Sequence, residues 1–155
     1  MTCIAAIVTR KGSIMGGDSA VSDSQTKLTM ADPKIRNFDG ILVGYAGSIV
    51  DGRTAFRGIS EHQPSSIVEY LENMTQHKRH HCSQFLVVEA GQIWEIEQGS
   101  AIRLADTYAA IGSGASFALG SLYRGHADLD DLRKALNCAE HFSPEVRGPM
   151  LILTA

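Results

Sequence analysis

The order of the expected secondary-structure elements is the feature that most restricts how this chain can fold. Short apolar runs rich in β-branched residues, separated by turn dipeptides such as Asp39-Gly40 and Ala90-Gly91, come in two blocks. Each block is followed by two stretches with apolar residues at helical spacing, and one more apolar run comes last. There is no regular strand–helix–strand alternation. The order therefore predicts an α+β domain in which two antiparallel sheets are covered by helices.

The boundaries of these elements follow from the same patterns and from the turn residues between them. Expected strands cover residues 3–9, 13–16, 34–38, 41–45, 85–89, 92–97, 102–104, 107–111 and 150–153. Expected helices cover residues 50–61, 67–74, 115–123 and 128–140. Ser65-Ser66 can cap the second helix, and Asp128 or Asp130 can cap the fourth.

Size, charge and cysteine usage narrow the class of protein. A chain of 155 residues fits a single domain spanning residues 1–155, and its net charge of −3 disfavours a general grip on nucleic acid or on an acidic membrane. The apolar run near the N-terminus is too short for a signal peptide or a membrane span. The three cysteines are Cys3, Cys82 and Cys138, an odd number that does not suggest a disulfide framework. A reducing compartment, and hence a cytoplasmic protein, is therefore expected.

Three residues in the first half of the chain suit one kind of hydrolytic chemistry. A hydroxyl such as that of Thr2 is a weak nucleophile until a base removes its proton. If Met1 is removed, Thr2 carries its own base, because a free α-amino group has a pKa of about 7.7–8.0. A nearby lysine such as Lys34 would keep the amine and the hydroxyl reactive, and Asp18 would orient that lysine.

With these residues in place, the chain resembles proteasome β subunits and the bacterial peptidase HslV. In those families the mature chain begins with Thr, followed by an Asp sixteen residues later and a Lys thirty-two residues later, as Asp18 and Lys34 follow Thr2 here. The segment Gly44-Tyr45-Ala46-Gly47 resembles the family segment that forms the oxyanion hole, which assigns the donor N–H to Gly47. Gly112-Ser113-Gly114 resembles the family motif before the third helix, which gives Ser113 a supporting role.

The resemblance implies a fold, an activity and an assembly. The fold is the N-terminal-nucleophile hydrolase sandwich of four layers, αββα. The activity is that of a threonine peptidase that cleaves unfolded polypeptides inside a homo-oligomeric ring or stacked rings, with an unfoldase ATPase as a further partner and with neither a cofactor nor a metal. The compact chain is typical of a bacterial or viral relative. The late Asp and Ser that support catalysis in proteasome β subunits have no clear counterpart here.

Two other functions are compatible with the same resemblance. The chain could be an amidase of this fold that acts on a small molecule, or a catalytically silent ring subunit with a structural role. Retention of the whole set of Thr2, Asp18, Lys34 and Gly47 argues against a silent subunit.

Other residues offer competing sites. Cys3 is a rival nucleophile, but its exposure requires removal of two residues and shifts the spacing to Asp18 and Lys34 by one; otherwise it is a small buried residue of the first strand. Gly112-Ser113-Gly114 before a helix could also cradle a phosphate, although it lacks the lysine of a P-loop. A cluster of potential metal ligands is interrupted by Lys78 and Arg79, which favours a solvated helix end; the cluster comprises His77, His80, His81 and Cys82.

We predict that Met1 is removed in the cell, because Thr2 is small and the chemistry needs its free amine. N-terminal sequencing of active protein is expected to read Thr-Cys-Ile. Retention of Met1 on nearly all of the active material would rule out Thr2 as a nucleophile that uses its own amine.

Overall fold

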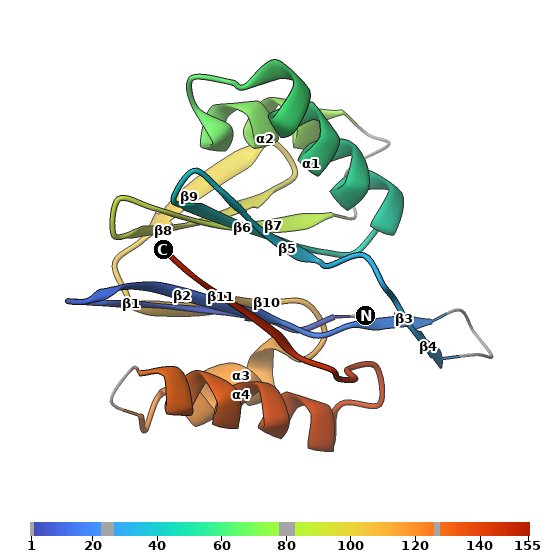
Figure 1. Cartoon of the computed structure of the whole chain (residues 1–155), viewed down its shortest axis with the longest axis vertical. Coiled ribbons are helices and arrows are strands. Elements are labelled where there is room, and N and C mark those ends of the chain that lie inside the picture. Colours follow the sequence, from blue (N-terminus) through green and yellow to red (C-terminus); the bar gives the residue numbers. More distant parts are fainter. Residues whose placement is uncertain (1, 23–26, 78–82, 126–127) are drawn as a thin grey trace.

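Four layers of secondary structure make up the computed structural model, which describes residues 2–22, 27–77, 83–125 and 128–155. Two antiparallel sheets face each other, and a pair of helices covers the outer face of each sheet (Figure 1). This arrangement confirms the predicted α+β class and the αββα sandwich. On one side lie α1 (Ile49–His62) and α2 (Ile67–Gln76), and on the other α3 (Ala115–Leu122) and α4 (Leu129–Phe142).

The two sheets contain the strands predicted from the apolar runs, with ends shifted by one or two residues. The four-stranded sheet has the order β10-β1-β2-β11, from β10 (Tyr108–Ile111), β1 (Ile4–Thr9), β2 (Gly12–Gly17) and β11 (Leu151–Thr154). The five-stranded sheet has the order β5-β6-β7-β8-β9, from β5 (Ile35–Phe38), β6 (Ile41–Ala46), β7 (Gln84–Glu89), β8 (Gln92–Glu97) and β9 (Ser100–Leu104).

A further hairpin, which the sequence patterns do not predict, follows β2. It consists of β3 (Ala20–Ser22) and β4 (Lys27–Thr29), paired antiparallel, with Leu28 61% exposed. Strands of three residues without a buried alternation carry too little pattern to be recognised in a sequence.

β1 lies in the middle of the molecule, which explains its unbroken apolar run. Cys3, Ala5 and Ile7 pack against α3 and α4, whereas Ile4 and Ala6 pack between the two sheets. All five are fully buried, because β1 is covered on both faces. Side chains of an extended chain alternate between faces, so Thr2 shares the face of Ile4 and is directed towards the space between the sheets.

Two glycines allow the sheets to approach closely near this end of β1. A Cβ on Gly44 of β6 would lie 2.6 Å from Ile4 Cγ2 of the facing sheet. A Cβ on Gly17 of β2 would lie 3.0 Å from Ile35 Cγ2 of β5, also across the two sheets. Any side chain at either position would push the sheets apart. The Gly44 of the Gly-Tyr-Ala-Gly segment therefore serves packing, and brings the end of β6 close to the start of β1.

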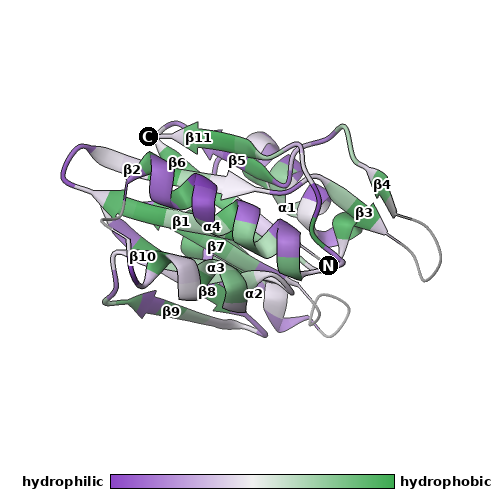
Figure 2. Cartoon of the chain, turned by 90° about the horizontal axis from the view of Figure 1, so that it is seen from below, coloured by the Kyte–Doolittle hydropathy of each residue, from purple (hydrophilic) through white to green (hydrophobic). Residues whose placement is uncertain are grey.

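On the outer faces, α2 and α4 are amphipathic, whereas α3 consists mostly of small and apolar residues. Figure 2 views the molecule from the side of α3 and α4 and shows α4 alternating between hydrophilic and hydrophobic residues along its length. Among the described residues, no helix is both long enough and apolar enough to cross a membrane.

Candidate active site

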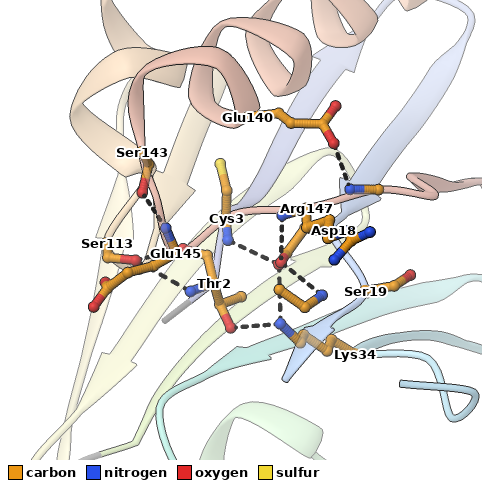
Figure 3. Close-up of polar contacts among 12 residues, drawn as sticks. Thr2, Cys3, Asp18, Ser19, Lys34, Ser113, Glu140, Ser143, Glu145 and Arg147 are labelled. Carbon is orange, nitrogen blue, oxygen red and sulfur yellow. Dashed lines mark hydrogen bonds and ion pairs between the residues drawn. The ribbon is translucent and has the colours of Figure 1, made fainter. Parts of the chain in front are cut away.

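Thr2, Asp18 and Lys34 meet at one end of the facing sheets (Figure 3). Lys34 Nζ donates a hydrogen bond to Thr2 Oγ1 at 2.9 Å and lies 3.0 Å from Asp18 Oδ1. Thr2 precedes β1, Asp18 follows β2, and Lys34 precedes β5, so both sheets contribute. While Met1 is attached, Thr2 and Asp18 are each 2% exposed and Lys34 is 3% exposed, so the whole group is buried.

The Asp18 carboxylate is held by main-chain donors as well as by Lys34. Its Oδ1 accepts the Cys3 N–H at 3.0 Å, and its Oδ2 accepts the N–H groups of Ala20 at 2.9 Å and Arg147 at 3.4 Å. With Lys34, these bonds use about the full acceptor capacity of an ionised carboxylate. Asp18 is thereby fixed in orientation and holds Lys34 Nζ against Thr2.

Lys34 is a charged group in a buried place, and its pKa reflects this. Burial lowers the pKa of Lys34 below its ordinary value of 10.5, and the charge and hydrogen bond of Asp18 only partly oppose the change. The lysine therefore gives up or shares a proton more readily than a solvated lysine does. That property suits a group in contact with a hydroxyl that must lose its proton.

The loop of residues 112–114, here named the serine loop after Ser113, binds the main chain of Thr2. The Gly114 N–H donates to Thr2 O at 3.1 Å, and Ser113 Oγ lies 3.2 Å from Thr2 N and 3.4 Å from Thr2 O. Gly112 has a φ of +90°, and a Cβ there would collide with Thr2 O. Thr2 N is a peptide nitrogen while Met1 is attached, and removal of Met1 would leave an amine beside the Ser113 hydroxyl.

Gly47 lies in the turn that follows β6 and has a φ of +101°, a left-handed conformation that favours glycine. The preceding Ala46 approaches the serine loop, because a Cβ on Gly112 would lie 3.2 Å from Ala46 Cβ and also against Thr2 O. The Gly47 turn, the serine loop and Thr2 are therefore neighbours. All five residues predicted for the site gather at this end of the molecule: Thr2, Asp18, Lys34, Gly47 and Ser113.

One contribution to the site comes from a segment that sequence reasoning missed. The connection between α4 and β11 passes the site, where the Arg147 N–H donates to Asp18 and the Ser19 N–H donates to Arg147 O at 2.9 Å. These contacts use main-chain atoms, so no residue type marks them in the sequence. In the sequence, this part of the chain has no clear counterpart of the late Asp and Ser of proteasome β subunits. Its main chain nevertheless holds Asp18 in place through the Arg147 N–H.

The structure argues against Cys3 as the nucleophile. Its side chain is fully buried in the cluster beneath α3 and α4, on the opposite face of the strand from Thr2. Burial, together with the charge of Asp18, raises the pKa of the Cys3 thiol to about 12. The thiol therefore stays protonated at neutral pH, and Cys3 has the structural role expected of a small buried residue.

The other two competing sites are the serine loop and the residues that follow α2. In the serine loop, the N–H groups of Gly112, Gly114 and Ala115 already donate within the chain, so these three groups are not free to bind a phosphate. Of the proposed metal ligands, His80, His81 and Cys82 lie outside the described residues. Among residues 2–22, 27–77, 83–125 and 128–155, no group of three or more His, Cys, Asp or Glu side chains could hold a metal ion.

Solved structures share this architecture over nearly the whole chain. HslV from Trypanosoma brucei superposes with a TM-score of 0.82 at 20% identity, covering 99% of this chain and 98% of that one. Thiobacillus denitrificans BPH in complex with epoxomicin gives 0.79 at 16% identity, with 98% and 97% covered. A Gly-1 mutant of Anbu from Hyphomicrobium sp. strain MC1 gives 0.80 at 12% identity, with 100% and 81% covered.

This chain has the HslV fold. The fold implied by the sequence resemblance is therefore confirmed by structures that share few residues with the chain. At the level of sequence, no protein-family model and no curated protein matches it. At identities this low the likeness establishes the fold alone, and the chemistry must be argued from the site that the HslV fold carries here.

The depressed pKa of Lys34 predicts how stability depends on pH. Between that pKa and 10.5 the folded chain has lost the Lys34 proton while the unfolded chain still holds it, so stability rises with pH. Lys34→Met lacks this contribution and leaves the Asp18 carboxylate without its cation, at a cost of about 3 kcal/mol. Urea unfolding at pH 7, 8, 9 and 10 is expected to show the stability difference between the two proteins widening with pH. A difference that narrows over this range would contradict a lowered pKa.

Proposed function

We propose that this protein is an N-terminal threonine hydrolase that cleaves peptide bonds in unfolded polypeptides in the cytoplasm. One observation carries the proposal: a buried lysine contacts the Thr2 hydroxyl at 2.9 Å and a carboxylate at 3.0 Å. Lysine side chains are seldom fully buried, because their charge is better solvated by water. The burial of Lys34 against the Thr2 hydroxyl therefore favours a catalytic role over a purely structural one.

The reaction can be written from these residues once Met1 has been removed. Thr2 Oγ1 attacks the carbonyl carbon of the substrate while its proton passes to the Thr2 amine, which is the base. The carbonyl oxygen becomes an oxyanion, and the Gly47 N–H stabilises it. The amine then gives the proton to the leaving nitrogen, the C–N bond breaks, and an ester on Thr2 remains. Water, deprotonated by the same amine, hydrolyses the ester and restores the hydroxyl.

The remaining groups prepare this reaction. The Lys34 ammonium lowers the pKa of the neighbouring amine and stabilises negative charge on Thr2 Oγ1. Asp18 keeps Lys34 oriented through the 3.0 Å ion pair. Ser113 Oγ, 3.2 Å from Thr2 N, is placed to accept a hydrogen bond from the amine or to pass a proton to it.

The surface favours an assembly, which we propose to be a homo-oligomeric ring or a pair of stacked rings. Phe117 of α3 and Phe142 of α4 stack with ring centroids 5.6 Å apart, although they are 38% and 60% exposed. Tyr123, which follows α3, is 79% exposed. Large aromatic side chains gathered on one exposed layer are typical of a surface that a second subunit covers. An enclosed chamber would restrict the peptidase to unfolded chains, and an unfoldase ATPase would be its supplier.

The first test of this proposal uses Thr2. Thr2→Ala is expected to lower hydrolysis of a fluorescent unfolded polypeptide by about 1,000-fold or more, because it removes the nucleophile. Thr2→Ser should keep part of the activity, since the hydroxyl and the amine both remain. Epoxomicin, found in complex with the BPH neighbour, is expected to increase the intact mass of the protein that begins at Thr2 and not that of Thr2→Ala.

Thr154→Ala serves as the control, because Thr154 is an exposed threonine of β11. Its activity should equal that of the unmodified sequence. Undiminished turnover by a clean preparation of Thr2→Ala would refute the mechanism. Cleavage of small amides with no cleavage of polypeptides would favour the small-molecule amidase.

The second test concerns assembly. The protein is expected to form a species many times its chain mass of 16.7 kDa at micromolar concentration, as measured by native mass spectrometry. Phe142→Asp should weaken that species, because a charge replaces an apolar contact. Val50→Asp, which introduces the same charge at a 72% exposed position of α1 in the opposite layer, controls for the added charge. A stable and active monomer would exclude the chamber.

A further inference from the structure

A buried hydrogen bond close to the Gly47 turn involves two residues with no part in the steps above. Ser83 Oγ donates to Asp51 Oδ2 at 2.6 Å. Ser83 is fully buried and Asp51 is 5% exposed. The short distance and the carboxylate acceptor are typical of a charge-assisted bond, roughly twice as strong as a neutral one. Burial of a carboxylate is costly unless it is well paired. The position of this bond in the fold therefore indicates what it holds in place.

The bond spans the turn that carries Gly47. Ala46 pairs with Gln84 in the ladder between β6 and β7, so the residues beyond this pair, Gly47 and Ser83, continue the two strands. The chain then enters α1, where the Ser48 hydroxyl caps the helix by accepting the Asp51 N–H at 3.3 Å. Through Asp51, the first turn of α1 is thus fastened back to the residue before β7. Gly47 lies inside this closed link.

Gln84 connects the same strand end to the serine loop. Its Oε1 accepts the Gly112 N–H at 3.3 Å, and its Nε2 donates to Glu97 Oε2 at 3.1 Å, which fixes the orientation of the amide. Gly112 begins the loop in which Ser113 and Gly114 hold Thr2. The dipeptide Ser83-Gln84 is therefore tied on one side to the oxyanion turn and on the other to the loop that positions the nucleophile.

We propose that Asp51, Ser83 and Gln84 are positioning residues for the hydrolysis, an inference that rests on the proposed function. They set the distance between the Gly47 N–H and Thr2 Oγ1, although none of them touches the substrate. An oxyanion donor acts at roughly 2.7–3.1 Å, and a displacement of about 1 Å can cost about 100-fold in rate. Gly47 is exposed and has no side chain of its own to hold it, so its neighbours must fix it.

Ser83→Ala, made in the protein that begins at Thr2, tests this role. The expected result is a fall in kcat of about 10- to 100-fold with a KM within about threefold, because the oxyanion forms only during the reaction. The pH dependence of kcat/KM should not change, since the Thr2 amine and Lys34 remain. Asp51→Asn keeps an acceptor for the Ser83 hydroxyl and is expected to give an intermediate kcat.

Thr75→Val provides a matched control. Thr75 is also fully buried, and its hydroxyl donates to Leu71 O at 2.9 Å within α2 and accepts the Gly99 N–H, from the turn between β8 and β9, at 3.0 Å. The substitution removes one buried hydroxyl, as Ser83→Ala does, and should lower the thermal midpoint by a similar amount. Its kcat is expected to stay within about twofold of the parent, because no link to the Gly47 turn is lost.

The outcomes separate this inference from the proposed function. A Ser83→Ala protein with a kcat within twofold of the parent would overturn the positioning role, and so would an equal loss of kcat in Thr75→Val. If Ser83→Ala does not fold, Gln84→Met at a half-buried position takes its place, with the same fall in kcat expected. A parent protein that begins at Thr2 yet neither cleaves polypeptides nor binds epoxomicin would refute the proposed function and this role together.

Discussion

The buried contact of Lys34 with Asp18 and Thr2 is the interaction around which the rest of this molecule is arranged. A charged pair withdrawn from water is stable only when its remaining acceptors are satisfied, because desolvation can exceed the attraction between the charges. Here three main-chain N–H groups complete the coordination of Asp18. They come from the residue before β1, from the residue that begins β3 and from the connection between α4 and β11. The pair therefore needs most of the fold in place.

Alternation along the first strand separates chemistry from packing at neighbouring residues. Thr2 is directed between the sheets, where Lys34 reaches its hydroxyl, whereas Cys3 points into the apolar cluster under α3 and α4. The same environment that keeps the Cys3 thiol protonated anchors the strand that presents Thr2. A shift of one residue along the strand would exchange the two faces and destroy the site.

Main-chain groups of loops supply much of the remaining site. Gly114, Arg147 and the proposed donor Gly47 act through their N–H groups, and the side chains of Ser83 and Gln84 connect the Gly47 turn with the serine loop. Loops can hold such positions only when rigid layers fix their ends. The three apolar clusters, one between the sheets and one under each helical layer, provide that rigidity.

The sequence by itself determined the element order, and hence the layered α+β class, because apolar periodicity and turn dipeptides are local signals. It also determined the spacing of Thr2, Asp18 and Lys34, which the structure brings into contact. Only the tertiary structure decided the short β3–β4 hairpin, the bracing of Asp18 by Arg147 and the link from Ser83 to Asp51. These features depend on main-chain atoms or on single polar residues brought together from distant parts of the chain, where no periodic pattern records them.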